Sequence, residues 1–326
     1  MMLHNDKETF IDLVKSTADN SGIAPAMIEK DYYVTLILNT LNQQVPGLLF
    51  KGGTSLAKCY DVIERFSEDV DLTLDKEHYT QGQKRDANKA VIEVCDKLGL
   101  NIANREEVEM HSHGNFNQYS IEYPIAFPSN DITPYVKVEM VFLQRAYPDE
   151  KQKANSYIGS YLESTGNQAV AKQYDLTQFD ISTQTLERTF VDKVFAVCDY
   201  YCHDMTHRNS RHIYDLSCLL TRVDLNSDKM VSLIDDVRED RKHNKLCISA
   251  QDGVDVPSLL KEIIDTDFYK KDYEESTSKL LMKPVPYEES IKSLQTIIDS
   301  RLFEREYYNK LDSSNDRSYG DDGYER

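Results

Sequence analysis

Two carboxylates that could hold a metal ion stand one residue apart in the stretch Ser67-Glu68-Asp69-Val70-Asp71-Leu72-Thr73-Leu74. Polar and apolar residues alternate here with a period of two, which predicts a half-buried strand. Asp69 and Asp71 therefore share one face of that strand. Hard cations such as Mg²⁺ take oxygen ligands and commonly use one or two carboxylates together with substrate phosphates. Facing a phosphate-binding turn, such a pair of carboxylates is what a divalent metal needs to carry a nucleoside triphosphate.

A glycine turn shortly before this strand predicts a phosphate-binding point beside the carboxylates. The apolar residues 48–50 predict a buried strand, two glycines follow as a turn, and two hydroxyl residues then begin an expected helix. Exposed backbone N–H groups at such a point attract phosphate. A Gly-Gly pair alone is usually a tight turn, and Asp-x-Asp alone is usually a solvated strand edge, but their order together favours a site. The predicted nucleotide-binding residues here are Gly52, Gly53, Thr54, Ser55 and Lys58.

The same segment resembles the signature of the DNA polymerase beta-like nucleotidyltransferases, which have a glycine turn, a helix and then Asp-x-Asp on a strand. It is more similar still to the AbiEii/AbiGii-type nucleotidyltransferase toxins. Those proteins resemble one another in Glu-Lys-Asp near the N-terminus, in Phe-Lys-Gly-Gly-Thr-Ser-Leu, and in Arg-Phe-Ser-Glu-Asp-x-Asp-Leu. This chain has Glu29-Lys30-Asp31, then the second motif at residues 50–56 and the third at residues 65–72.

The resemblance implies further active-site residues. Glu139, on a strand expected over residues 134–143, is the candidate third carboxylate, and Lys137 on the same face would contact phosphate or balance charge. The alternative is an ordinary Lys–Glu pair on a surface strand. Lys193 is expected to neutralise triphosphate charge, and Asp215 to orient Lys193 or act as a base; the alternative is a salt bridge between packed helices. The expected catalytic residues are Asp69, Asp71, Glu139, Lys193 and Asp215, and the expected metal ligands are Asp69, Asp71 and Glu139.

The activity that the resemblance implies is transfer of a nucleoside monophosphate from an NTP to an acceptor hydroxyl, dependent on Mg²⁺ or Mn²⁺. The implied role is that of a toxin in a toxin–antitoxin or abortive-infection (phage defence) system, beside a separate antitoxin protein. The expected acceptor is the 3′ end of a tRNA, and nucleotidylation of a protein is the alternative. A non-catalytic nucleotide sensor or partner-binding module is a second hypothesis, and a metal-dependent phosphohydrolase is a third.

Charge and composition constrain these hypotheses. The net charge of −18 over 326 residues would repel a long polyanion, because binding to nucleic acid depends on neutralising phosphates. It indicates a small contact with any nucleic-acid acceptor, or a different acceptor. No apolar run approaches the length of a membrane span, and no signal peptide is recognisable. The six cysteines are scattered without a paired framework, so we expect free thiols and a cytoplasmic protein with no membrane contact.

We expect an α+β fold, with a mixed nucleotidyltransferase-like sheet flanked by helices and followed by a mostly helical C-terminal region. The expected domains are residues 1–180 with the sheet and N-terminal helices, residues 181–310, which are helical, and a disordered polar tail at residues 311–326. His111 and His113 are expected in a solvated loop. The expected helices are 6–20, 23–44, 84–98, 185–197, 227–245, 257–265 and 287–305, and further strands are expected at 116–127 and 134–143.

Overall fold

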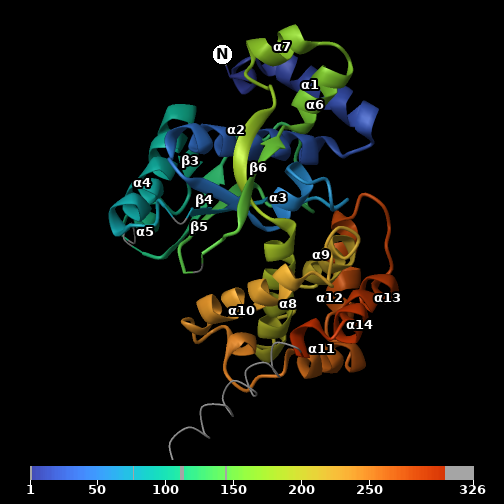
Figure 1. The fold of residues 1–326 in the computed structure, drawn as a ribbon. Helices are drawn as coiled ribbons and strands as arrows, with labels where there is room; N and C mark the ends of the chain where they lie inside the picture. Colours follow the sequence, from blue (N-terminus) through green and yellow to red (C-terminus); the bar gives the residue numbers. More distant parts are fainter. Residues whose placement is uncertain (1, 76, 111–113, 144, 305–326) are drawn as a thin grey trace, which may run out of the picture. The chain divides into compact units, whose positions relative to one another are not determined.

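The chain forms two units (Figure 1). The computed structural model describes residues 2–75, 77–110, 114–143 and 145–304. The first unit comprises Met1–Thr185 together with Leu280–Lys283, and the second comprises Leu186–Lys279 together with Pro284–Arg326. The expected tail at 311–326 and the residues His111 and His113 lie outside the described residues. The expected domain limits stay a prediction.

Within the described residues, seven strands of the first unit form one mixed sheet in the order β3-β4-β5-β2-β1-β7-β6. β2 runs parallel to β5 and antiparallel to β1, and β1 runs parallel to β7. The strands are β1 (Leu48–Lys51), β2 (Asp69–Leu74), β3 (Asn101–Ile102), β4 (Phe116–Glu122), β5 (Tyr135–Val141), β6 (Asp149–Ala154) and β7 (Phe179–Gln184). This sheet and its flanking helices confirm the α+β class.

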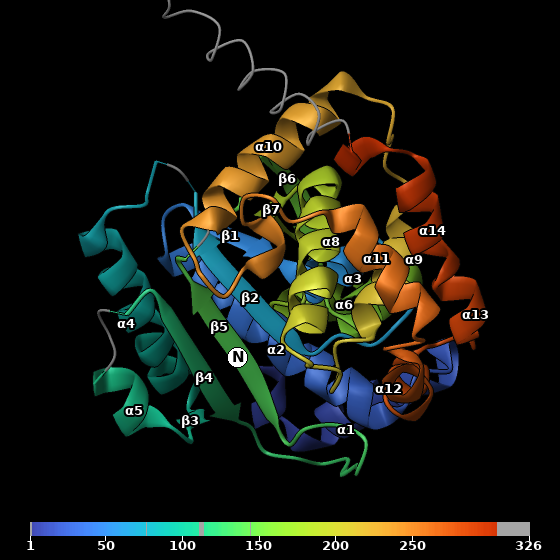
Figure 2. The ribbon, with the colours of Figure 1, turned by 90° about the horizontal axis from the view of Figure 1, so that it is seen from below.

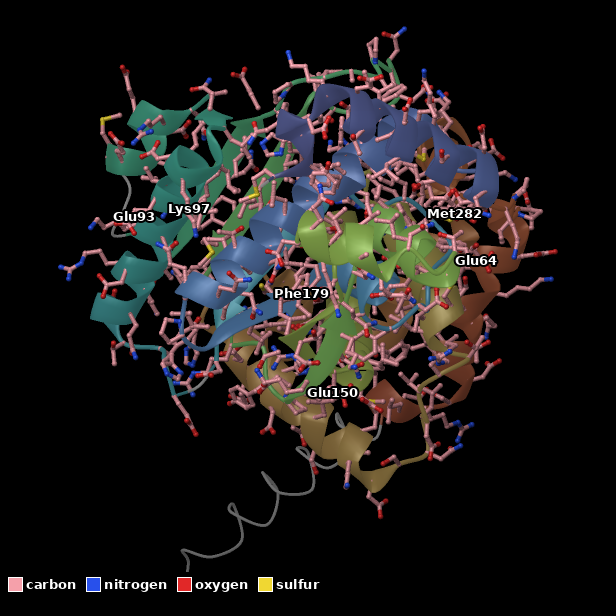
Figure 3. All side chains as sticks on the ribbon, turned by 90° about the horizontal axis from the view of Figure 1, so that it is seen from above. Glu64, Glu93, Lys97, Glu150, Phe179 and Met282 are labelled. Atoms are coloured by element: carbon pink, nitrogen blue, oxygen red, sulfur yellow. The ribbon has the colours of Figure 1, made fainter. Side chains whose placement is uncertain are left out.

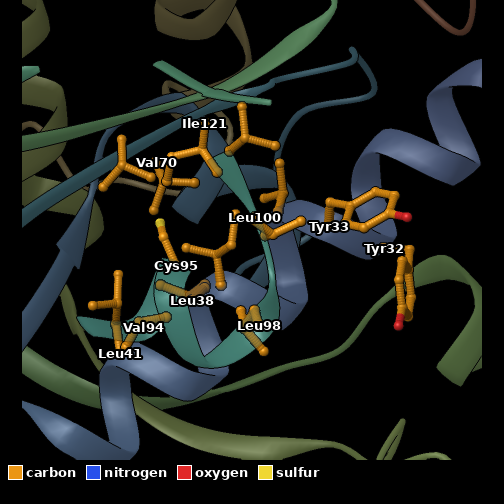
Figure 4. Close-up of a cluster of buried hydrophobic side chains, with 14 of the residues drawn as sticks. Tyr32, Tyr33, Leu38, Leu41, Val70, Val94, Cys95, Leu98, Leu100 and Ile121 are labelled. Atoms are coloured by element: carbon orange, nitrogen blue, oxygen red, sulfur yellow. The ribbon is translucent and has the colours of Figure 1, made fainter. Parts of the chain in front are cut away.

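Helices α2 and α4 cover one face of the sheet. The helical elements of the first unit are η1 (Leu3–Asn5), α1 (Lys7–Ser21), α2 (Pro25–Gln44), α3 (Gly52–Lys58), α4 (Gln81–Leu98), α5 (Arg105–Met110), α6 (Tyr157–Ser164) and α7 (Gln168–Gln173). Val70 and Leu72 of β2 are fully buried in the core with residues of α2 and α4. Figure 4 shows this core, and Figure 2 shows the sheet from the other side, with β4, β5 and β2 in front of α2. Because side chains alternate along a strand, the intervening residues of β2 lie on the face opposite α2.

Local sequence explains where the two covering helices begin and end. Pro25 lies in the first turn of α2, where its missing N–H costs no helical hydrogen bond. Thr80 and Gln83 form a capping box at the start of α4, and Gly99 ends that helix in the left-handed conformation with φ of 68°. A residue with a side chain adopts this conformation only at a cost, so glycine is favoured there.

The structure adds strands that the sequence analysis did not predict. β6 has the sequence DEKQKA and is largely exposed along its length, so it lacks the alternating apolar residues that mark a half-buried strand. β3 has only two residues. The helix expected over residues 287–305 is wrong as one element, because it is divided into α13 (Tyr287–Ser290) and α14 (Lys292–Asp299).

The second unit is helical in its described residues. Its helices are α8 (Leu186–Cys202), α9 (Arg211–Leu219), α10 (Asp228–Lys242), α11 (Val256–Asp265), α12 (Lys270–Glu275), α13 and α14, with short 3₁₀ turns η2 (Ile248–Ala250) and η3 (Thr277–Leu280). α8 packs against α9, α10 and α11, and Phe190, Val194 and Val197 on α8 are fully buried. No helix in the described part of the chain is long and apolar enough to cross a membrane. None of the six cysteines forms a disulfide.

A short segment from late in the sequence completes the first unit. The N–H of Phe66 donates to the carbonyl of Leu280 at 2.8 Å, and the N–H of Met282 donates to the carbonyl of Glu64 at 2.9 Å. Figure 3 shows Glu64 and Met282 close together. These bonds fix residues 64–66, which lead directly into β2.

Replacing Leu38 with Ala should destabilise the first unit by about 2–5 kcal/mol, because a buried Leu leaves a cavity when it is truncated. Leu38 on α2 is fully buried and points among Val94, Cys95 and Leu41 (Figure 4). Lys97→Ala on the exposed side of α4 is the control, with an expected change within about 0.5 kcal/mol. Urea unfolding measures both, and equal midpoints for the two variants would contradict this core assignment.

Candidate active site

The parallel pairing of β2 and β5 brings four charged residues together on one face of the sheet. Asp69 lies opposite Lys137, and Asp71 lies opposite Glu139. The core residues Val70 and Leu72 alternate with the two aspartates, so these four charges lie on the face away from α2 and α4. Three of the five predicted catalytic residues are therefore neighbours on adjacent strands.

Lys137 connects the carboxylates of this cluster. Its ammonium lies 3.3 Å from Oδ2 of Asp69 and 3.0 Å from Oε1 of Glu139. Its side chain is 26% exposed, and those of Asp69 and Glu139 are 13% and 19% exposed. The two ion pairs of Lys137 are therefore half-buried, and the attraction within each is stronger than between fully solvated charges.

Burial and neighbouring charges shift the pKa values of Asp71 and Lys137 on this face. Burial raises the pKa of Asp71 to about 6, and the neighbouring charge of Glu139 contributes in the same direction. Burial alone would lower the pKa of Lys137, but the carboxylates of Asp69 and Glu139 outweigh it and raise the pKa. A concentration of negative charge held out of water is poised to bind a cation.

The first glycine of the turn is required by the carboxylate beside it. Gly52 begins α3 directly after β1 with φ of +80°. A Cβ atom at this position would lie 2.0 Å from Oδ2 of Asp71. At Gly53 a Cβ atom would lie 2.5 Å from a guanidinium nitrogen of Arg65. The Gly-Gly pair therefore allows the turn to approach both the second aspartate of the motif and the arginine before β2.

The two hydroxyls of the turn make internal hydrogen bonds. The Thr54 hydroxyl donates to the carbonyl of Asp69 and lies 3.0 Å from Oγ of Ser67. The Ser55 hydroxyl donates to the carbonyl of Gly52 at 2.8 Å. Both side chains are buried. In this arrangement the hydroxyls fix α3 against the start of β2, and their predicted contact with nucleotide stays a prediction.

Lys58 is also held inside the protein. Its ammonium forms an ion pair with Asp31 and donates to the hydroxyl of Thr35 at 2.7 Å and to the carbonyl of Asn155 at 3.3 Å. Its side chain is only 6% exposed. Contact between Lys58 and a phosphate would require this buried ion pair to open, so the geometry favours a bracing role between α2 and α3.

The predicted metal site of Asp69, Asp71 and Glu139 stays a prediction. Among the residues that the structure describes, no three His, Cys, Asp or Glu side chains gather closely enough to hold a metal ion. The ammonium of Lys137 forms ion pairs with both Asp69 and Glu139, and so supplies positive charge to this face. The donors are all carboxylate oxygens, which fits Mg²⁺ or Mn²⁺ in chemistry. Water, or substrate phosphate oxygens when substrate is bound, would supply the remaining ligands of such an ion.

Lys193 and Asp215 form a buried ion pair in the second unit. The ammonium of Lys193 on α8 lies 2.7 Å from Oδ2 of Asp215 on α9, and the two side chains are 7% and 0% exposed. Nδ1 of His212 lies 3.4 Å from the same ammonium, and the His212 ring stacks on Tyr200. This is the salt bridge between packed helices that the sequence analysis gave as the alternative. A catalytic role for either residue stays a prediction.

Sequence analysis did not single out Lys51 as a functional residue. Lys51 ends β1 directly opposite Asp71, and its positive charge lowers the pKa of that carboxyl against the effect of burial. It therefore adds a second ammonium to the face that carries the carboxylates. The available signal was its position immediately before the glycine turn, in the Phe-Lys-Gly-Gly motif.

Comparison with protein families gives one match that spans most of the chain. Residues 37–300 match the family model described as the nucleotidyl transferase AbiEii toxin of a type IV toxin–antitoxin system. This range includes the glycine turn, the carboxylates of β2 and β5, and the ion pair of α8 and α9. A search of curated proteins gave no match. The chain therefore belongs to the AbiEii family of nucleotidyl transferase toxins.

Proposed function

We propose that this protein transfers a nucleoside monophosphate from an NTP to an acceptor hydroxyl, with the charged face of β2 and β5 as its active site. The observation that carries the proposal is the pairing of Asp69 with Lys137 and of Asp71 with Glu139, next to a glycine turn that closely approaches Asp71. Carboxylate oxygens can ligate the metal ion that accompanies a triphosphate, and ammonium groups can neutralise the charge of its phosphates.

Each charged residue has a proposed role. Asp69 and Asp71 would hold Mg²⁺ or Mn²⁺, and such an ion, when bound, would supply Lewis-acid stabilisation of the phosphate oxygens. Lys51 and Lys137 would neutralise charge on the triphosphate as pyrophosphate leaves. Glu139 would complete the metal ligands or accept the proton of the attacking hydroxyl. The partial exposure of Glu139 supports access for an acceptor.

Lys193 and Asp215 have different proposed roles in catalysis. Asp215 is fully buried and ion-paired, which supports its proposed role in orienting Lys193 and does not favour a role as a base. Lys193 would then contribute positive charge toward the triphosphate. The His212 ring beside the ammonium restricts the positions that the lysine can adopt.

Family membership supports a proposed biological role. The AbiEii family is a family of type IV toxin–antitoxin toxins, so we propose a cytoplasmic toxin with a cognate antitoxin and a function in abortive infection. The 3′ end of a tRNA is the proposed acceptor. The net charge of −18 supports a contact limited to a short terminus, and it equally suits a protein acceptor, which is the alternative.

Incubation of the purified protein with each α-³²P-labelled NTP, Mg²⁺ and total cellular RNA and protein tests this proposal. Label on a tRNA-sized band is the expected result, and label on a polypeptide would show that the acceptor is a protein. Asp71→Asn should lower transfer by at least about 100-fold, because it removes a metal-binding charge. Asp75→Asn, just beyond the end of the same strand, is the control and should retain transfer. Nucleotide binding without any labelled product would favour the sensor hypothesis.

The raised pKa of Asp71 predicts how stability depends on pH. Its carboxyl has a pKa of about 6 in the folded chain against an ordinary value of 3.8. The folded state thus keeps this proton longer than the unfolded state, and the contribution of Asp71 to stability falls as pH rises from about 4 to about 6.

Asp71→Asn should therefore raise the melting temperature at pH 8, by about 3 °C, and the gain should vanish below about pH 4. Thermal unfolding in EDTA measures the difference between variant and unaltered chain, with no divalent ion present. A gain that is the same at pH 8 and at pH 4 would refute the assigned titration.

Gly52→Ala should abolish most transfer activity, because its Cβ would displace the Asp71 carboxylate and the residue would keep an unfavourable φ of +80°. The strain alone costs roughly 1–2 kcal/mol. Gly82→Ala is the matched control, because a Cβ atom there meets no other atom within 4 Å. Transfer assays and thermal unfolding compare the two variants, and unimpaired transfer by Gly52→Ala would count against the proposed site.

A further inference from the structure

Lys30, in the second turn of α2, is a buried charge that the proposed reaction does not use. Its side chain is 0% exposed. Its ammonium donates to Oε2 of Glu68 at 2.5 Å, to the carbonyl of Thr133 at 2.9 Å and to the hydroxyl of Thr133 at 2.5 Å. The Thr133 hydroxyl also donates to Oε2 of Glu68 at 3.0 Å. One ammonium group therefore holds two distant points of the chain together.

Those two points lie at the beginnings of the strands that carry the active-site charges. Glu68 immediately precedes Asp69, the first residue of β2, and Thr133 lies two residues before β5. β2 and β5 are parallel, so both strands begin at the same edge of the sheet. Lys30 thus fixes the two strands to each other beside the rung formed by Asp69 and Lys137.

The residues on either side of Lys30 reach other segments. Glu29 accepts hydrogen bonds from the N–H groups of Ala126 and Phe127 at 2.8 and 2.9 Å. Asp31 pairs with Lys58 and accepts from the N–H group that begins α6. Of the hydrogen bonds described here for these three residues, those of Lys30 reach residues next to both β2 and β5.

Stability alone is a poor explanation for this arrangement. Taking an ammonium and a carboxylate out of water is costly, and a buried pair can often be replaced by apolar residues of similar volume without loss of stability. What an apolar pair cannot supply is a directional tie between the two strands. A fixed offset between β2 and β5 sets the distance from Asp69 and Asp71 to Glu139.

We propose that Lys30 is a positioning residue. Through Glu68 and Thr133 it fixes the start of β2 against the start of β5, and so the register that pairs Asp69 with Lys137 and Asp71 with Glu139 on the face proposed to bind a divalent cation. The inference rests on the proposed function in assigning a metal to this face. Residues that orient metal ligands typically change metal affinity by about 10- to 100-fold when they are altered, and we expect an effect of that size from Lys30.

Three variants separate positioning from stability. Lys30→Met leaves Glu68 as a buried charge without its ammonium partner and should both unfold at lower temperature and bind metal weakly. The double variant Lys30→Met with Glu68→Leu removes both charges, so it should recover most of the stability while the polar tie stays absent. Leu38→Ala, on the same helix, destabilises the core without altering the tie and should retain normal metal affinity.

The measurement is titration with Mn²⁺ alone, followed by electron paramagnetic resonance of the free ion, beside thermal unfolding of each variant. The dissociation constant for Mn²⁺ should rise by about 10- to 100-fold in the single and double Lys30 variants and stay unchanged in Leu38→Ala. Amide hydrogen exchange at the start of β2 and β5 should be faster in the double variant. This measurement detects the loss of the link from Lys30 to Glu68 and Thr133 without any metal.

A stable double variant that binds Mn²⁺ as the unaltered chain does would overturn the positioning role, whatever the reaction proves to be. Equal weakening in Leu38→Ala would also overturn it, because general destabilisation would then explain the loss. Absence of Mn²⁺ binding in the unaltered chain would remove both the metal site and this role. If the Lys30 variants behave as expected but the unaltered chain transfers no nucleotide, the proposed function alone fails.

Discussion

The repulsion between carboxylates on one face of a sheet is the constraint on which the rest of the first unit depends. Asp69, Asp71 and Glu139 lie on adjacent parallel strands, where their charges oppose one another at close range in a partly dry environment. Folding tolerates this because Lys137 and Lys51 supply positive charge and because the strands are held in a fixed register. The pKa of Asp71 is raised chiefly by burial and further by the charge of Glu139.

Much of the sequence motif acts as scaffold around that cluster. Thr54, Ser55 and Lys58 direct their polar groups into internal hydrogen bonds and an ion pair. Gly52 leaves room for the Asp71 carboxylate, because a Cβ atom at this position would collide with it. These internal contacts hold the turn and α3 against β2 and α2, and contact of the three residues with nucleotide stays a prediction.

The Glu-Lys-Asp tripeptide extends the same principle to the N-terminal helix. Three adjacent charged residues of α2 reach three different parts of the first unit, and all three are buried. Consecutive helical positions point in directions about 100° apart, which allows one turn to reach separate segments. A buried polar network of this kind specifies one arrangement of its partners, since any other arrangement would leave charges unsatisfied.

The sequence by itself determined the local elements and the family. The alternation around Asp69 and Asp71 and the glycine turn each depend on residues close in the chain, so they predicted β2 and the turn that precedes it. The same holds for β5, which set Lys137 and Glu139 on one face. Weakly patterned strands were missed, because β6 is exposed and polar and carries no periodic signal.

Only the tertiary structure decided which polar groups are available for chemistry. Hydroxyl and ammonium groups bind whichever partner folding brings near, and those partners are distant in sequence: Asp31 for Lys58, and Thr133 with Glu68 for Lys30. The rung that pairs Asp71 with Glu139 likewise depends on a parallel register that no local pattern encodes. Local periodicity fixes the face on which a residue lies, whereas long-range packing fixes what that residue meets.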